Sequence, residues 1–263
     1  MLEIKNVHKT FFAGTVNERV ALQEINLTLG AGEFVTVIGS NGAGKSTILN
    51  ITSGKLRPDS GSVSIDGRDV TRLADYQRAK FIGRVFQDPM AGTSPEMTIE
   101  QNMAIAYERG QRRGLAMGVT RKKRDFFREE LKSLELGLEN RLKAKVGLLS
   151  GGQRQALSLL MATFSGPNIL LLDEHTAALD PQRAALVSRL TAEIVQRHQL
   201  TTLMVTHNME QALQLGTRLI MMHEGRIILD LDQEQKSRMT VPDLLHEFEK
   251  IKGGALDDRT MLQ

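Results

Sequence analysis

A glycine-rich run near residue 40 has the residue types and spacing needed to hold the phosphates of a nucleotide. It matches the pattern G-x-x-x-x-G-K-S/T and consists of Gly39, Ser40, Asn41, Gly42, Ala43, Gly44, Lys45, Ser46 and Thr47. Glycines let backbone N–H groups curl around phosphate oxygens, and a following helix adds the positive end of its dipole. In such a loop Lys45 reaches the β- and γ-phosphates and Ser46 offers a hydroxyl to Mg²⁺. The pattern therefore predicts a site for ATP and Mg²⁺.

Two adjacent carboxylates form a second candidate group. Asp173 and Glu174 directly follow the apolar run 169–172, which reads as a strand. Asp173 at the strand end suits a contact to Mg²⁺, and Glu174 is placed to orient or deprotonate an attacking water. Alone, such a pair is usually a solvated turn, but a phosphate loop upstream makes the catalytic interpretation the better one.

A third motif is the run 149–153, whose polar members are Ser150, Gly151, Gly152 and Gln153. Ser150 is a candidate N-cap, and the glycines allow close backbone approach at a second helix start. The helix that follows is expected to bury Leu157, Leu160 and Met161. One bound nucleotide needs only one phosphate cradle, so an ordinary capped helix is the alternative if this motif is taken alone.

The elements that must position these groups follow from apolar periodicity. Strands are expected at 2–7, 21–29, 34–38, 62–65, 82–86, 169–172, 201–205, 219–223 and 227–231. Residues 46–52 are expected to form a helix closed by Gly54, and another helix begins at Pro181 with Asp180 as its N-cap. That second helix is expected to bury Val187, Leu190 and Ile194.

Between these strand-rich parts the periodicity is helical, with Phe127, Leu131 and Leu134 on one face. We therefore predict an α/β protein with a nucleotide-binding core at 1–87 and 166–235 and a helical subdomain at 88–165. A short C-terminal extension, 236–263, is expected to hold one amphipathic helix over 241–248 and a mobile tail from Gly253 onward.

Composition narrows the classes further. The chain has 263 residues with 41% hydrophobic and 25% charged residues and a net charge of +3, as in globular proteins. It contains no cysteine, so disulfides and thiolate metal sites are excluded. Aromatic residues are 4% with no tryptophan, which disfavours base-stacking surfaces and a nucleic-acid partner. No stretch reaches the ~18 apolar residues of a membrane span, and the start lacks a signal peptide, so a cytoplasmic location is expected.

The order of the three motifs, with a helical insert between the first and second, resembles the ATPase subunit of an ABC transporter, over residues 2–231. The resemblance implies a P-loop cassette: a mixed sheet with an antiparallel β part and an inserted helical subdomain. It identifies 149–153 as the signature motif, which contacts ATP held by a second copy of the chain.

Smaller motifs of that family match single positions. Phe11 corresponds to the aromatic residue that stacks on adenine, and Asp180 belongs to the loop that crosses the dimer interface. Gln87 corresponds to the glutamine that contacts Mg²⁺ and the attacking water, and His207 to the histidine at the γ-phosphate. Glu174, His207, Gln87 and Lys45 are thus implied as catalytic, and Ser46, Gln87 and Asp173 as metal ligands. His175 replaces the usual proline, which predicts a looser loop and a titratable group near Glu174.

The resemblance implies hydrolysis of ATP to drive solute transport through a separate membrane permease. The expected system is a bacterial importer of an amino-acid-like solute, with a solute-binding protein outside and this subunit at the inner membrane face. Two chains are expected to enclose two ATP molecules head to tail. The alternative is an ABC ATPase acting on DNA or ribosomes, which usually has two cassettes or a coiled-coil insert. A regulator without turnover conflicts with Glu174.

Two surface features leave alternatives open. Met90, Met97, Ile99 and Met103 follow Gln87 and either line a groove for a permease helix or fill the core of the insert. A basic cluster in the helical insert is interpreted as a solvated face, and the alternative is a contact to anionic lipid headgroups. The cluster consists of Arg112, Arg113 and the run 121–124.

Overall fold

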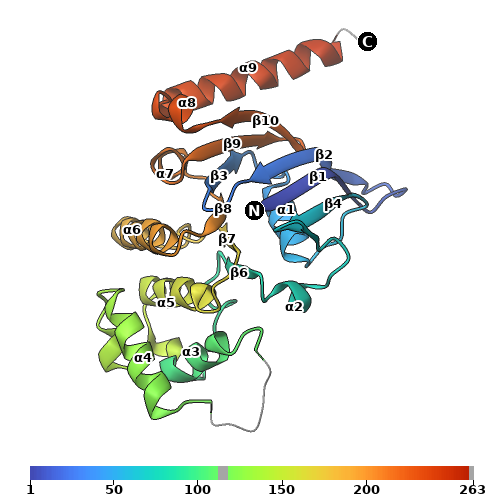
Figure 1. The fold of residues 1–263 in the computed structure, drawn as a ribbon. Helices are drawn as coiled ribbons and strands as arrows, with labels where there is room; N and C mark the ends of the chain where they lie inside the picture. The colour runs from blue at the N-terminus through green and yellow to red at the C-terminus, as the bar shows by residue number, and fades with distance from the viewer. Residues whose placement is uncertain (112–117, 261–263) are drawn as a thin grey trace.

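Two β-sheets form the frame of the protein (Figure 1). The structure is a computed structural model that describes residues 1–111 and 118–260, so Arg112 and Arg113 lie outside it. The larger sheet runs in the order β10 (Arg226–Leu231), β9 (Arg218–His223), β3 (Phe34–Gly39), β8 (Thr201–Val205), β7 (Ile169–Asp173) and β6 (Ile82–Val85). Its strands are parallel except for β10, which pairs antiparallel with β9.

The smaller sheet is antiparallel and confirms the expected antiparallel part. Its order is β2 (Arg19–Leu29), β1 (Leu2–Phe11), β4 (Ser60–Ile65) and β5 (Arg68–Asp69). Helix α1 (Lys45–Ser53) lies between the two sheets and ends at Gly54 in the left-handed conformation, as predicted. One hydrophobic cluster joins side chains of both sheets to Ile48, Leu49 and Ile51 of α1. This packing fixes the start of α1, where the phosphate loop ends.

The central strands are buried on both faces, as their continuous apolar runs predict. In β7, Ile169 and Leu171 pack into the cluster around α1. Leu170 and Leu172 point the other way, into a second cluster that contains the helices between β6 and β7. Because these strands pack on both faces, the packing sets where the loops at their carboxyl ends begin.

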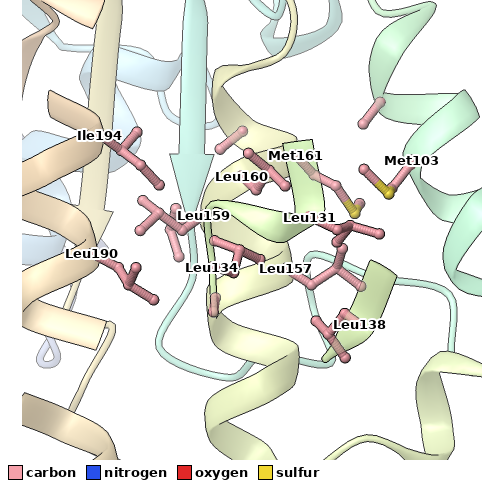
Figure 2. Close-up of a cluster of buried hydrophobic side chains, with 14 of the residues drawn as sticks. Met103, Leu131, Leu134, Leu138, Leu157, Leu159, Leu160, Met161, Leu190 and Ile194 are labelled. Atoms are coloured by element: carbon pink, nitrogen blue, oxygen red, sulfur yellow. The ribbon is translucent and has the colours of Figure 1, made fainter. Parts of the chain in front are cut away.

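The chain between β6 and β7 is helical. After the short α2 (Asp75–Arg78) and β6, it forms α3 (Ile99–Tyr107), α4 (Arg121–Lys132), η1 (Leu138–Asn140), η2 (Val146–Leu148) and α5 (Gly151–Thr163). Figure 2 shows Leu159 of α5 beside Leu190 and Ile194, while Leu157 faces Leu131 and Leu138. The exact division at residues 88 and 165 stays a prediction, since the second cluster also includes strand residues.

Two of the four apolar residues considered for a permease groove are core residues. Ile99 and Met103 are fully buried in the second cluster because they lie on the inner face of α3. Met97 is half-buried and Met90 is 39% exposed. Core filling is therefore the role of Ile99 and Met103, and only Met90 presents a large exposed surface.

The C-terminal part returns to the sheet and then leaves it. Helix α6 (Pro181–His198) precedes β8, and α7 (Met209–Gln214) precedes β9. After β10 come α8 (Gln233–Ser237) and α9 (Val241–Thr260), which lies along the outer edge of the molecule (Figure 1). The expected short helix with a tail from Gly253 is wrong, because α9 continues through both glycines. Packing of Leu244 and Phe248 against the strands gives the helix a tertiary anchor that its sequence alone does not reveal.

Candidate nucleotide site

The phosphate loop joins β3 to α1, and its glycines are required by close backbone contacts. A Cβ at Gly39 would lie 2.1 Å from the carbonyl oxygen of Met222. Gly44, the N-cap of α1, has a φ of 100°, and a Cβ there would lie 2.5 Å from the carbonyl oxygen of Ala21. No larger residue fits at either position without moving a strand. The glycine spacing is therefore set by how closely the loop passes β2 and β9.

A cavity of about 200 Å³ lies over this loop. Its lining includes Asn41, Gly42, Gly44, Lys45, Ser46 and Thr47 of the loop, together with Phe11, Arg19 and Glu174. Phe11 at the end of β1 thus faces the cavity, where the family motif requires an aromatic ring. Sequence reasoning missed Arg19, whose Nη2 donates to the carbonyl oxygen of Gly42 at 3.3 Å. A lone arginine at a strand start carries no signal, because only the pairing of β1 with β2 brings it to the loop.

Lys45 is held over the loop by its own backbone. Its Nζ donates to the carbonyl oxygens of Gly39 at 2.8 Å and Ser40 at 2.9 Å, and the residue is only 6% exposed. Burial lowers the pKa of Lys45, and the Glu174 carboxylate partly offsets this by raising the pKa. The ammonium is thus positioned in a poorly solvated place, where its attraction to phosphate is strong.

Parallel strands bring the remaining candidates to one edge of the sheet. Glu174 follows β7, His207 follows β8 and Gln87 follows β6. Gln87 Nε2 donates to Glu174 Oε2 at 3.2 Å, and His207 Nδ1 lies 3.4 Å from the same oxygen. Two of the predicted catalytic side chains, Gln87 and His207, therefore converge on the carboxylate of a third, Glu174. Glu174 itself has a φ of 44°, a left-handed conformation that is costly for a non-glycine residue and turns the chain at the strand end.

Asp173, one residue earlier, is paired with a residue that the sequence did not single out. Arg84 Nη2 donates to Asp173 Oδ2 at 2.8 Å, and Asp173 keeps a side-chain exposure of 16%. Among the described residues, no cluster of three or more His, Cys, Asp or Glu side chains could hold a metal alone. Mg²⁺ in nucleotide sites is usually bound through one or two carboxylates plus phosphate oxygens, so the Asp173 carboxylate, with the Ser46 hydroxyl and the Gln87 amide oxygen, fits this ion in the presence of ATP.

The signature motif is formed as predicted but lies apart from this cavity. Ser150 caps α5, with its Oγ accepting from Gln153 N at 3.3 Å in a capping box. Asp180 caps α6 and accepts from Arg183 N at 3.1 Å. A Cβ at Gly152 would meet the side chain of Arg183, and one at Gly151 would meet Leu179. The signature and Asp180 are thus neighbours of each other, and neither contributes to the lining of the phosphate-loop cavity.

The expectation that His175 loosens the loop after Glu174 is wrong, because its side chain is buried and bonded to α6. It is 2% exposed, and its Nε2 lies 2.9 Å from Thr191 Oγ1. Thr191 Oγ1 donates its only proton to the carbonyl oxygen of Val187. In the bond between His175 and Thr191, His175 Nε2 must therefore be the donor. Burial lowers the pKa of His175 to about 4, which keeps the ring neutral at physiological pH.

Comparison with known proteins decides what this arrangement is. The family model described as "ABC transporter" matches residues 22–177, a stretch that runs from β2 past the carboxylate pair. The chain belongs to the ABC transporter family. It is therefore an ATPase subunit of an ABC transporter, with the cassette fold and ATP as its nucleotide.

Individual relatives of this ABC protein are transport ATPases. The chain is 45% identical over 249 residues to a tyrosine transport ATP-binding protein of Clostridioides difficile, covering 95% of this chain and 99% of the relative. It is 35% identical to the methionine import ATP-binding protein MetN 2 of Enterococcus faecalis, covering 87% of this chain and 64% of the relative.

A solved structure extends the likeness to three dimensions. A dimeric ATP-binding cassette in a post-hydrolysis state with ADP and Pi has a TM-score of 0.76 and 32% identity. The match covers 89% of this chain and 99% of that one. Among the described residues of the ABC subunit, no helix is long and apolar enough to cross a membrane.

Proposed function

We propose that this subunit hydrolyses ATP to drive the import of an amino-acid-like solute through a separate permease, with Glu174 as the residue that activates water. The convergence of Gln87 and His207 on Glu174 Oε2, beside the Lys45 loop, carries the proposal. A carboxylate there can orient a water molecule and accept its proton as the water attacks the γ-phosphate.

The neighbouring groups stabilise the charge that develops. Lys45, on the phosphate loop, neutralises the β- and γ-phosphates, and His207 contacts the γ-phosphate from the opposite loop. Gln87 donates to Glu174, which orients the carboxylate and leaves the amide oxygen as a ligand atom of the type that Mg²⁺ prefers. Mg²⁺, held by Ser46, Asp173 and Gln87 together with ATP, would supply charge neutralisation at the phosphates.

The separation of the signature from the phosphate-loop cavity supports a head-to-tail dimer. Ser150, Gly151, Gly152 and Gln153 lie beside the Asp180 loop and not over Lys45 of the same chain. In the proposed dimer each signature therefore closes the ATP site of the partner; a solved relative of this chain is dimeric with ADP and Pi bound. Closing and opening of this dimer would transmit force to the permease.

The permease contact is proposed beside Gln87. A groove of about 360 Å³ at β6 is lined by Ser53, Lys55, Asp75, Arg84, Phe86 and Arg109, among others. Arg84 is already paired with Asp173, but Lys55 and Arg109 still outnumber Asp75, which favours an acidic loop of a permease at the cytoplasmic membrane face. Met90, exposed near the same strand end, adds an adaptable apolar contact.

The proposal that the solute is amino-acid-like is supported by the names of the tyrosine and methionine relatives. A solute-binding protein would complete the importer.

The catalytic part is tested with Glu174→Gln, which keeps the shape of the side chain and removes its charge. Multi-turnover phosphate release should fall at least about 100-fold, the usual contribution of a positioned base, while ATP binding by calorimetry is retained. Phosphate release near the wild-type rate would remove Glu174 from this role.

The proposed solute class is tested by reconstituting the subunit with its permease in vesicles and measuring uptake of tyrosine and methionine against a sugar control.

A further inference from the structure

Gln211 on α7 joins two loops that carry proposed catalytic residues. It is 8% exposed, and its side-chain amide is bonded to hydroxyls from three separate segments. Its Oε1 accepts from Thr206 Oγ1 at 2.9 Å, while its Nε2 donates to Ser188 Oγ at 2.8 Å and to Thr176 Oγ1 at 3.0 Å. Both amide protons and the amide oxygen are therefore used, which fixes the orientation of the amide.

The backbone around Thr206 supports this direction of hydrogen bonding. Thr206 Oγ1 accepts from Asn208 N at 3.1 Å, so its own proton is available for Gln211 Oε1. Gln211 N donates in turn to Asn208 Oδ1 at 2.9 Å, which caps α7. The turn that holds His207 is thus tied to Gln211 through both its side chain and its backbone.

Two of the three tied segments lie next to a proposed catalytic side chain. Thr176 comes two residues after Glu174, and Thr206 comes one residue before His207. Where β7 ends, Glu174 N donates to the carbonyl oxygen of Val205 at 2.9 Å. Beyond that point a cavity of about 630 Å³ opens between α6 and α7, with Gln211 in its wall. At the wall of this cavity, hydrogen bonds through Gln211 bridge the two loops.

We propose that Gln211 is a positioning residue that sets the distance between Glu174 and His207 during ATP hydrolysis; this rests on the proposed roles of those two residues. The strained backbone of Glu174 relaxes unless its surroundings hold it, and Thr176 is the anchor on its far side. A displacement of about 1 Å at a reacting group can reduce a rate about 100-fold. ATP binding should be unaffected, because Lys45 and its loop follow β3.

The test is Gln211→Met, which keeps length and volume and removes the hydrogen bonds. We expect kcat for ATP to fall at least about 10-fold with KM and ATP affinity unchanged, since only positioning is lost. Gln214→Met, an exposed glutamine one turn along α7, is the matched control and should keep the wild-type kcat. A variant that lost rate through misfolding would instead lose ATP affinity and melting temperature together.

Thr176→Val provides the second line of the test, because it removes a single hydroxyl and endangers folding least. It should lower kcat at least about 3-fold, and combined with Gln211→Met it should cause no further loss, since both break the same link. Multiplied losses, or a wild-type kcat in Gln211→Met while Glu174→Gln is inactive, would overturn the inference and leave the proposed function intact. Activity in Glu174→Gln would overturn both.

Discussion

Arg84 Nη2 donates to Asp173 Oδ2 at 2.8 Å, in an ion pair whose side chains are only 12% and 16% exposed. The same guanidinium donates from Nη1 to Asn50 Oδ1 at 2.8 Å and to Ser53 Oγ at 3.2 Å, at the end of α1. One side chain on β6 therefore connects the predicted Mg²⁺ ligand to the helix that begins with Lys45. The two ends of the nucleotide site are held relative to each other through this cation.

Arg84→Met should consequently destabilise the protein by about 2 kcal/mol, since it leaves a poorly solvated carboxylate without its cation. Chemical denaturation measures the change in the free energy of unfolding. Arg128→Met is the matched control, because its ion pair with Asp125 is 41% and 60% exposed and should contribute less than about 1 kcal/mol. Equal losses in the two variants would contradict a special role for the Arg84 pair.

Gly152→Asp should block hydrolysis without blocking ATP binding. A Cβ there would lie 3.1 to 3.3 Å from the Cδ, Cβ and Cγ atoms of Arg183, so the Arg183 side chain must shift by a few tenths of an ångström to admit the aspartate. In the proposed dimer the new carboxylate adds negative charge to the signature that approaches the partner's γ-phosphate, and phosphate release should fall at least about 100-fold through loss of the site's preorganised charge. ATP binding to the monomer and ATP-dependent dimerisation by light scattering are measured together. Gly118→Asp, at a glycine with open space, is the control. Normal turnover in Gly152→Asp would mean that the signature does not act across an interface.

Met90→Glu should uncouple the subunit from the membrane while the isolated protein stays active. Arg154 Nη1 lies 2.8 Å from Met90 Sδ, so a glutamate at this exposed position gains a cationic neighbour. Phosphate release by the purified chain should stay within about 2-fold of wild type, whereas co-purification with the permease is lost, because a charge replaces an apolar contact that binding would desolvate. Leu245→Glu on α9 is the control for an exposed apolar residue elsewhere. Undiminished co-purification of Met90→Glu would refute this contact.

His175 should make the protein less stable in mild acid. Its pKa is about 4 in the folded chain, against 6.5 for a solvated histidine, so the unfolded state binds more protons between these pH values. The free energy of unfolding should therefore decrease as pH falls from 6.5 to 4, by about 3 kcal/mol in total. His175→Asn should flatten this pH dependence, while His198→Asn, at an exposed position on α6, should not. An unchanged slope in His175→Asn would assign the acid sensitivity to other groups.

Local chemistry was readable from the sequence because short-range rules dictate it. The strand order along the chain, the start of α1 after Gly44 and the caps Ser150 and Asp180 all depend on neighbours within a few residues. The family motifs then located Glu174, Gln87 and His207 on three separate strand ends. Parallel pairing of β6, β7 and β8 brings their carboxyl ends to one edge of the sheet. The convergence of these three residues therefore follows once a parallel sheet has been predicted.

Only the tertiary structure decided which other side chains act on that edge. Arg19, Arg84 and Gln211 are separated by long stretches of chain from Gly42, Asp173 and Thr176, and no local pattern marks them. The same holds for His175, whose partner Thr191 lies on α6, and for the length of α9, which depends on packing against β9 and β10. A sequence pattern reports which face of an element is buried, whereas the pairing of polar groups between elements depends on distances that folding alone sets.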